Sequence, residues 1–294
     1  LNYRTALGYA RPGEDMAGRY WPPDLQLMAK DILKFHAVIW PAMLMAAGLP
    51  LPGQVYAHGW LLVGGEKMSK SKLTGIAPEQ IIDHFGVDAF RYYFLRAIQF
   101  GNDGSFSWED MAARYTSELA NGLGNLGSRA TAMVGKYFDG VLPAPGAFAN
   151  ADLALADALL TAVQDADGAY SRLDFTAGIG AVKIFVDAVN LYVTEQEPWA
   201  LAKRADDPVA RERLATVLYT TCEALRAVAV LHNSVMPRAM GALWESIGAA
   251  EGLGAIGDQR IGDVSRWGQL PAGVRVTKGA ALFPRLPEDA PAGA

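Results

Sequence analysis

Two lysines three residues apart stand in a short turn whose composition suits phosphate binding. Lys67 and Lys70 follow the pair Gly64-Gly65, and Lys72 comes just beyond them. Ammonium groups are compact point charges that stabilise the negative charge developing on a departing pyrophosphate, and a glycine hinge lets such a loop close on the phosphates and open again. Because an isolated K-x-x-K is usually a solvated surface loop, the assignment depends on the sequence around it.

A second group of residues has the types that read single-stranded RNA. Asn125 and Arg129 are four apart in a helical pattern, so both side chains project from one face. Trp199 follows Pro198 directly, at an expected helix break where the indole can stay open for stacking. RNA loops are read by stacking unpaired bases on aromatic rings and by hydrogen bonds to their edges. The simpler interpretation is a solvated helix face and a tryptophan packed between helices.

The elements that must position these residues fall into two patterns. Residues 1–65 predict strand, helix and strand, with a helix over 30–47 that kinks or restarts at Pro41 and a strand over 55–63 that ends in glycines. This order suits a parallel α/β layer, which is incomplete because it has too few strands for a doubly wound sheet. From Pro78 onward the pattern is helical, so the fold class is a partial Rossmann-type α/β catalytic layer followed by a mainly α-helical bundle.

The helical part contains clear start and stop signals. Pro78 is typical of a first helical turn, Gly86 of a helix end, and Asp88 of the cap of the next helix. Ser107 has capping-box spacing and opens a helix expected to continue to about Phe138. Further helices are predicted over 152–172, 175–193, 208–232 and 237–247. We expect four segments: 1–65 as the catalytic layer, 66–107 as the lysine loop and connecting helices, 108–250 as the bundle, and 251–294 as an extension returning towards the catalytic region.

Bulk properties narrow the class of protein. The chain has 294 residues, of which 51% are hydrophobic, a net charge of -5 and a pI near 5.4, so bulk attraction does not bring it to nucleic acid and any RNA contact must be local. No run of 18 apolar residues and no signal peptide is visible, which indicates a cytoplasmic protein that does not enter membranes. The single cysteine, Cys222, lies in an apolar helical pattern and is expected to be buried. Disulfides and a cysteine-ligated zinc site within the chain are therefore not expected.

The lysine loop resembles the KMSKS signature of class I aminoacyl-tRNA synthetases. The matching residues are Lys67, Met68, Ser69, Lys70 and Ser71. The stretch that begins Asp88-Ala89-Phe90 follows at the spacing of that family, and His58-Gly59-Trp60 precedes it as the family's strand does. The resemblance implies that the loop residues bind ATP, with Lys67 and Lys70 as the catalytic pair.

The region upstream of the loop narrows the resemblance to methionyl-tRNA synthetases. Residues 29–36 resemble the pattern G-K-D-I-x-x-F-H, and residues 40–44 match W-P-A-M-L. The resemblance implies that Asp31 contacts the ribose, that His58 lies near the nucleotide, and that methionine is bound by Tyr3, Ile32 and His36. An apolar pocket with one hydroxyl and one imidazole donor suits a thioether, which is a weak acceptor. Taken alone, Asp31 would be a helix cap and His36 a buried core histidine.

The same family resemblance extends to the helical half. Methionyl-tRNA synthetases carry similar N-L-x-x-R and E-Q-x-P-W segments that contact the CAU anticodon, so the likeness assigns Asn125, Arg129 and Trp199 to anticodon recognition in tRNA-Met. The implied reaction uses methionine, ATP and Mg²⁺, with no zinc in this chain, and transfers the activated methionine to tRNA.

Part of the family pattern is missing. The four histidines do not form the H-x-G-H signature of class I synthetases, and the chain opens at Leu1 without an initiator methionine. We therefore expect a fragment that lacks the N-terminal half of the catalytic domain and cannot form methionyl-adenylate alone. Two alternatives stay open: a non-catalytic anticodon-binding module, and a related class I synthetase for another amino acid such as leucine, isoleucine, valine or cysteine.

Overall fold

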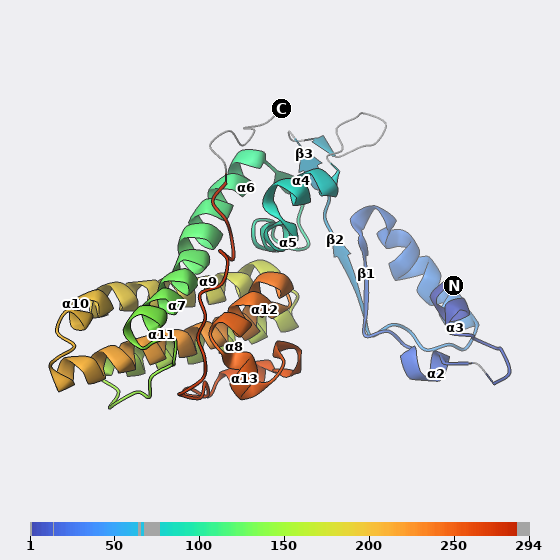
Figure 1. Cartoon of the computed structure of the whole chain (residues 1–294). Coiled ribbons are helices and arrows are strands. Elements are labelled where there is room, and N and C mark those ends of the chain that lie inside the picture. Colours follow the sequence, from blue (N-terminus) through green and yellow to red (C-terminus); the bar gives the residue numbers. More distant parts are fainter. Residues whose placement is uncertain (1, 14, 64–65, 68–76, 287–294) are drawn as a thin grey trace. The chain divides into compact units, whose positions relative to one another are not determined.

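The chain forms two compact units. The computed structural model describes residues 2–13, 15–63, 66–67 and 77–286. One unit comprises residues 1–74 with 100–105, and the other comprises residues 75–99 with 106–294. Figure 1 shows the strands and short helices of the first unit and the helical bundle of the second. The first unit is smaller and sheet-based, while the second is almost entirely helical.

The first unit contains a short parallel sheet. Strand β1 (Leu25–Ala29) pairs in parallel with β2 (Gln54–His58), so that Ala29 lies opposite His58. The connection between them is helical, as the sequence predicts, and Pro41 lies in the first turn of its last segment. The helix continues into this segment directly from the π-helical turn before it, and the altered hydrogen-bond spacing of that turn lies where Pro41 has no N–H to donate. The connecting segments are η1 (Lys30–Ile32, a 3₁₀ turn), η2 (Phe35–Ile39, a π-helical turn) and α3 (Trp40–Ala46).

The single strand predicted over residues 55–63 is wrong, because the structure has two strands there, separated by Gly59 and Trp60. Strand β2 ends at His58, and a separate strand β3 (Leu61–Val63) pairs antiparallel with β4 (Glu66–Lys67). On its other side β3 is followed by β5 (Gly104–Phe106). A Cβ atom at Gly59 would lie 2.1 Å from the backbone oxygen of Asn102, so only glycine fits this crossing. The two remaining helices of the unit are α1 (Asn2–Ala6) and α2 (Ala17–Tyr20).

The second unit confirms the helices predicted from capping signals. Prolines stand in the first turns of four of its helices, where their fixed backbone angle is suited to helix entry. The helices before the bundle core are α4 (Pro78–Phe85), α5 (Val87–Arg96), α6 (Trp108–Arg114), η4 (Tyr115–Gly124) and α7 (Asn125–Tyr137). Those that follow are α8 (Asn150–Ser171), α9 (Phe175–Gln196), α10 (Pro198–Ala202), α11 (Pro208–Asn233), α12 (Pro237–Ser246), α13 (Ala249–Leu253), η5 (Ile256–Asp258) and α14 (Ile261–Val264).

Asp88 does not cap its own helix, contrary to the sequence-based prediction. Gly86 ends α4 and also precedes α5, with a φ of 84° that glycine adopts without strain. The Asp88 carboxylate instead accepts a hydrogen bond of 2.6 Å from the backbone N–H of Ala239, in the first turn of α12. A carboxylate near a helix N-terminus is favourable wherever in the chain it originates. Sequence spacing alone could not reveal a partner 151 residues away.

Helix α11 is the core of the bundle. Its buried residues include Leu214, Leu218, Leu225 and the unpaired Cys222, which has no exposed surface. Burial raises the pKa of the Cys222 thiol to about 12. Among the described helices, α11 and the stretch from α9 through α10 are long and apolar enough to cross a membrane. The core helices of other proteins also meet this criterion. Nearly all of the apolar part of α11 is buried inside the bundle.

Candidate functional site

Two residues expected to contact the nucleotide lie at the same edge of the parallel sheet. Asp31 lies in the 3₁₀ turn that follows β1, and His58 is the last residue of β2. The two strands are parallel and in register, so both residues occupy the carboxyl edge of the sheet, where open α/β folds bind their ligands. The His58 ring is held by a 2.8 Å contact between Nδ1 and the Gly59 carbonyl oxygen.

A neighbouring group that was not assigned from the sequence reinforces this edge. The Lys30 ammonium lies 2.7 Å from both carboxylate oxygens of Asp103 and 4.2 Å from the centre of the Trp60 ring. The backbone N–H of Trp60 also donates to Asp103, at 2.8 Å. Hydrogen bonds from Lys30 and Trp60 lower the pKa of Asp103. The position of Lys30 immediately after a strand was the available signal, but its partner lies 73 residues away.

The residues expected to bind methionine are only partly brought together. His36 lies one helical turn after Ile32, and its Nδ1 is 3.1 Å from the Ile32 carbonyl oxygen. The His36 ring also meets the edge of Trp40, with ring centres 6.1 Å apart. Tyr3 lies on α1, and its hydroxyl donates to the Tyr20 carbonyl at 3.4 Å. Within the described part of the chain, no hydrogen bond joins Tyr3 to His36 or Ile32.

Much of the apolar surface in this unit faces solvent. Phe35, Val38, Met43 and Met45 on η2 and α3 are 53–67% exposed. Large exposed apolar patches often mark sites where another protein surface binds. Parallel sheets are also normally covered on both faces and contain more strands than two. The unit therefore presents an apolar surface against which another polypeptide segment could pack.

The lysine loop can be described only at its start. Strand β4 ends at Lys67, whose backbone pairs with that of Leu62 in β3. The remaining predicted loop residues, Met68, Ser69, Lys70 and Ser71, lie outside the described residues. The pairing shows that a β-hairpin leads into the loop, and the roles of its side chains stay predictions. No group of three His, Cys, Asp or Glu side chains in the described ranges is arranged to hold a metal ion.

In the bundle, two of the three expected anticodon residues are in contact. The Arg129 guanidinium on α7 lies 5.4 Å from the centre of the Trp199 ring on α10. This is within the range of a cation–π interaction. Asn125 is exposed at the first position of α7, one turn before Arg129. The arrangement places a flat ring, a planar cation and an amide on neighbouring positions of one surface.

A π-helical segment sets the direction in which α7 presents these side chains. The long helix predicted over 107–138 is interrupted by η4, whose ten residues make wider turns than an α-helix. Its backbone is supported from α9, because the Asn190 amide donates to the Gly122 carbonyl at 3.4 Å. At Gly124 a Cβ atom would lie 3.1 Å from the Leu119 carbonyl oxygen, a contact so tight that a larger residue would require a small shift of the backbone. Period analysis of the sequence does not distinguish π from α turns over this length.

Trp199 stands just after a break between two helices. Helix α9 ends at Gln196, and Glu197 takes a left-handed conformation with φ 45° and ψ 56°. Pro198 is buried and opens α10. The left-handed residue is uncommon for a side chain larger than glycine, and it allows the chain to turn at once and present Trp199 half-buried beside Arg129.

A buried carboxylate and its partner arginine hold the end of α9 in place. Asp152 on α8 is fully buried and receives two hydrogen bonds from Arg213, at 2.5 and 3.0 Å, and one from the Tyr192 hydroxyl. Arg213 also donates to the Gln196 side chain at 2.7 Å. Burial alone would raise the pKa of Asp152, but the hydrogen bonds from Arg213 and Tyr192 outweigh it and hold that pKa below its usual range. This group, here called the Asp152 clamp, joins α8, α9 and α11 at the residue where α9 ends.

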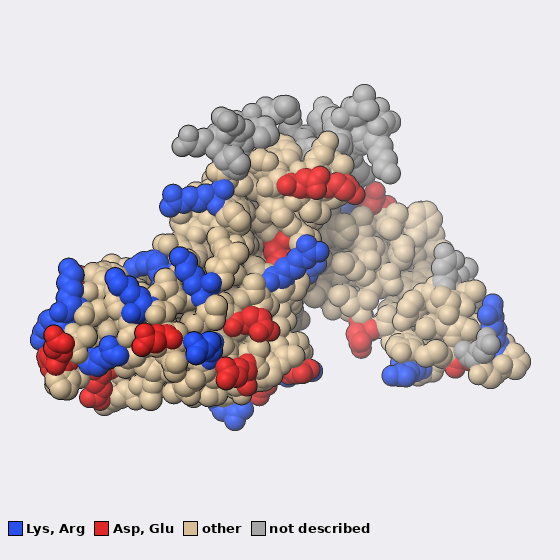
Figure 2. Space-filling view, viewed as in Figure 1, with Lys and Arg blue, Asp and Glu red and all other residues tan. Residues whose placement is uncertain are grey.

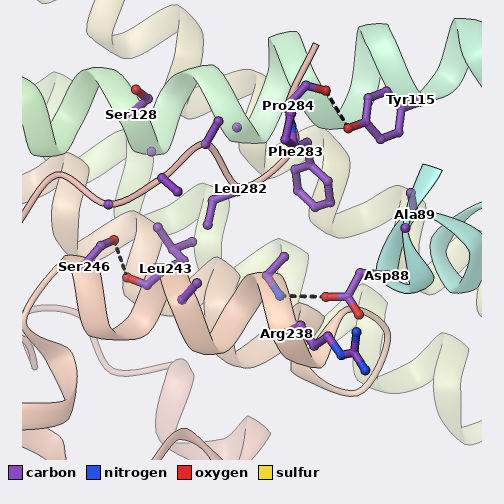
Figure 3. A pocket seen from close by; sticks show the side chains of 18 of the residues that line it. Asp88, Ala89, Tyr115, Ser128, Arg238, Leu243, Ser246, Leu282, Phe283 and Pro284 are labelled. Carbon is purple, nitrogen blue, oxygen red and sulfur yellow. Dashed lines mark hydrogen bonds between the residues drawn. The ribbon is translucent and has the colours of Figure 1, made fainter. Parts of the chain in front are cut away.

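A pocket of about 360 Å³ lies elsewhere in the second unit and contains none of the predicted site residues. Figure 3 shows it between α12, α7 and the extended C-terminal segment. The Tyr115 hydroxyl ties that segment by donating to the Pro284 carbonyl at 2.6 Å, and Phe283 packs beside the Tyr115 ring. Asp88 borders the pocket through its bond to α12. The segment therefore fastens to the bundle in the region where α5 also meets it.

Sequence comparison identifies relatives with a common activity. Residues 1–131 match the sequence profile of the family described as tRNA synthetases class I (M). The chain is 61% identical to a methionine-tRNA ligase of Streptomyces coelicolor, over 98% of this chain and 53% of that protein. It is 42% identical to one of Caldanaerobacter subterraneus, over 97% of this chain and 43% of that protein. The chain thus spans about half the length of the curated relatives it matches.

Solved structures agree with the sequence comparison. The fold matches that of Mycobacterium tuberculosis methionyl-tRNA synthetase in complex with methionyl-adenylate, with a TM-score of 0.88 and 37% identity. It also matches the free form of that enzyme with a TM-score of 0.83 and 34% identity. Both matches cover 97% of this chain and 54% of the solved one. The likeness therefore includes the helical bundle as well as the α/β layer.

Proposed function

This chain is related over almost its whole length to the class I methionyl-tRNA synthetases, and from that premise we propose that it carries the anticodon-reading domain and part of the adenylation site of a methionine-tRNA ligase. The contact between Arg129 and Trp199 beside the exposed Asn125 carries the proposal. In this assignment residues 1–65 belong to the catalytic layer, 66–107 to the loop and its connecting helices, 108–250 to the anticodon domain and 251–294 to a returning extension. The enzyme works in the cytoplasm with tRNA-Met.

The anticodon is read by stacking and by hydrogen bonds. A base leaving the loop stacks on the open side of Trp199, an interaction worth about 1–3 kcal/mol per base. Arg129, already lying against the same ring, donates to a base edge or stacks on the next base. The Asn125 amide offers both a donor and an acceptor. Because these contacts involve base faces and edges, they can distinguish CAU from other triplets, which phosphate contacts cannot do.

The adenylation step uses the carboxyl edge of the parallel sheet. Methionine attacks the α-phosphorus of ATP through its carboxylate, and pyrophosphate leaves, so the protein has to position the reactants and stabilise charge. Asp31 binds the ribose hydroxyls and His58 lies beside the nucleotide, while Lys67 and Lys70 neutralise the departing pyrophosphate. Mg²⁺ would be held mainly by the ATP phosphates and water, and would supply further positive charge at the departing pyrophosphate.

The methionine pocket would be completed only when more of the catalytic domain is present. Tyr3, Ile32 and His36 supply one hydroxyl, one apolar wall and one imidazole for the thioether. Each such feature contributes about 1–3 kcal/mol of discrimination against other aliphatic side chains. We propose that the exposed apolar surface of η2 and α3 packs against the part of the catalytic domain that its relatives carry outside this span. The chain alone is accordingly expected to be inactive in adenylation.

Binding of RNA hairpins tests the proposal directly. Fluorescence titration of the whole chain with a CAU anticodon stem-loop, compared with a stem-loop of changed anticodon, should show a preference for CAU. The preference should disappear in Trp199→Ala while the helical circular dichroism is unchanged. Equal binding of both hairpins by the unaltered chain would remove the methionine-specific assignment.

The competing function is RNA binding without catalysis. It is supported by the compact second unit, which contains the bundle and has its own core. The two roles differ in ATP chemistry. Methionine-dependent exchange of pyrophosphate into ATP should appear when the chain is mixed with the complementary half of a close relative, and it should be lost with Lys67→Gln. A chain that binds the CAU hairpin but never restores exchange would be an anticodon-binding module only.

A further inference from the structure

The polar face of α7 extends well beyond the residues that contact the Trp199 ring. Asn125, Arg129 and Lys136 are separated by four and seven positions, so they follow one stripe along the helix. The opposite face, with Leu126, Ala130 and Val134, is buried in the bundle. At 1.5 Å per residue, Arg129 and Lys136 are about 10 Å apart along the axis, which corresponds to about three stacked nucleotides of one strand.

Two cations lie against aromatic rings in consecutive positions of the chain at the far end of this stripe. The Lys136 ammonium lies 5.3 Å from the centre of the Tyr137 ring. The Arg211 guanidinium, from the first turns of α11, lies 4.2 Å from the centre of the Phe138 ring, immediately after α7. Both cations are exposed. Aromatic contacts orient the two groups without neutralising their charge.

The pair differs from other cations of the bundle in its surroundings. Arg204 bonds to Asp207 at 3.3 Å, and Lys183 bonds to Asp187 at 2.5 Å. Among the residues that the structure describes, neither Lys136 nor Arg211 forms an ion pair. Figure 2 shows basic side chains gathered over the end of the bundle that contains α7, α10 and α11, with acidic ones between them. Because the chain as a whole is acidic, it can bind a polyanion only where cations such as these two are not neutralised by neighbouring carboxylates.

We infer that Lys136 and Arg211 form a phosphate-binding site for the RNA strand whose bases are read at Arg129 and Trp199. The inference rests on the proposed anticodon function and names a separate, sequence-independent contact. The strand passes from the Trp199 ring along α7 and places one phosphate at each of the two cations. Both charges are held on rings that lie in consecutive positions of the chain, so little ordering is needed when the phosphate arrives.

The salt dependence of RNA affinity distinguishes the phosphate contact at Lys136 and Arg211 from base recognition at Arg129 and Trp199. Each phosphate neutralised on a single strand contributes about 0.7 to the slope of log affinity against log salt. In a Lys136→Gln, Arg211→Gln double variant of the whole chain, the slope for the CAU stem-loop should become shallower by about 1.4, equivalent to about sevenfold in affinity over a fourfold change in potassium chloride. The ratio of affinities for CAU and changed-anticodon hairpins should stay as in the unaltered chain.

The matched control removes two positive charges from another part of the bundle. Lys183→Gln with Arg238→Gln alters two cations on α9 and α12 and should leave the slope unchanged. An equal fall of slope in this control, or an unchanged slope in the Lys136 and Arg211 variant, would overturn the inference. Thermal unfolding followed by circular dichroism shows whether each variant keeps its fold. Trp199→Ala, measured in parallel, tests the proposed function itself, because it should remove the CAU preference and leave the slope almost intact.

Discussion

Replacing Arg213 should be among the most damaging single changes in the bundle. In Arg213→Met the fully buried Asp152 loses two hydrogen bonds and its counter-ion, while the Tyr192 hydroxyl and the Ala149 N–H remain as donors. Breaking a buried pair on one side costs about 3–5 kcal/mol. Two donors remain and the Arg213 side chain is 21% exposed, so we expect the lower end, about 3 kcal/mol. This corresponds to a fall in Tm of roughly 6–12 °C.

The pH dependence gives the prediction a second, independent check. Because the folded-state pKa of Asp152 is depressed, the clamp stabilises the fold above the unfolded-state pKa near 4 and this contribution is lost as the pH falls further. In Arg213→Met the carboxylate is buried without a counter-ion, so its pKa should rise and it should take up a proton on folding. The difference in unfolding free energy between the two proteins should therefore be largest at pH 7 and shrink towards pH 4.

Urea titration followed by far-ultraviolet circular dichroism measures both quantities. Arg204→Met is the matched control, because it removes the same side chain from an exposed pair in which Arg204 is 71% and Asp207 42% exposed, and such pairs contribute about 0–1 kcal/mol. A loss below about 1 kcal/mol in Arg213→Met, or an equal loss at pH 7 and pH 4, would contradict the role assigned to the Asp152 clamp.

Three further predictions concern single side chains. Gln196→Met removes the bond from Arg213 to the end of α9 and should weaken CAU hairpin binding several-fold with little change in Tm; unchanged binding would show that the clamp does not position Trp199. Burial lowers the pKa of His232 to about 4, so stability should fall as the pH drops from 6.5 towards 4, and His232→Phe should flatten that part of the profile. Cys222 should resist iodoacetamide in the folded chain and react after unfolding in urea, since it is fully buried; rapid labelling of the native chain would contradict this.

Local signals in the sequence predict most of the bundle. Helices α4, α11 and α12 begin at Pro78, Pro208 and Pro237, because proline is tolerated where a helix starts. Gly86 ends α4 because it can adopt a positive φ. These effects act within a few residues, so a single sequence contains them.

Long-range partners account for what the sequence does not predict. The backbone of Asn102 leaves no room for a side chain at Gly59, where the predicted strand is interrupted, and the carboxylate of Asp88 accepts a hydrogen bond from the first turn of α12. The Asp152 clamp joins residues that are 61 positions apart. None of these contacts has a local sequence signature. In the candidate site, the family resemblance nominated Arg129 and Trp199, but only the structure puts them in contact.

The acidic character of the chain has a consequence for how it selects RNA. A net charge of -5 opposes the approach of any polyanion, and this repulsion is screened beyond about 10 Å at 0.1 M salt. Binding therefore depends on close contacts, of which the stack at Trp199 is nearly independent of salt and the cations at Lys136 and Arg211 are not. Raising the salt should lower affinity for every hairpin in similar proportion. The preference for CAU over another anticodon should consequently persist at salt concentrations where absolute binding has become weak.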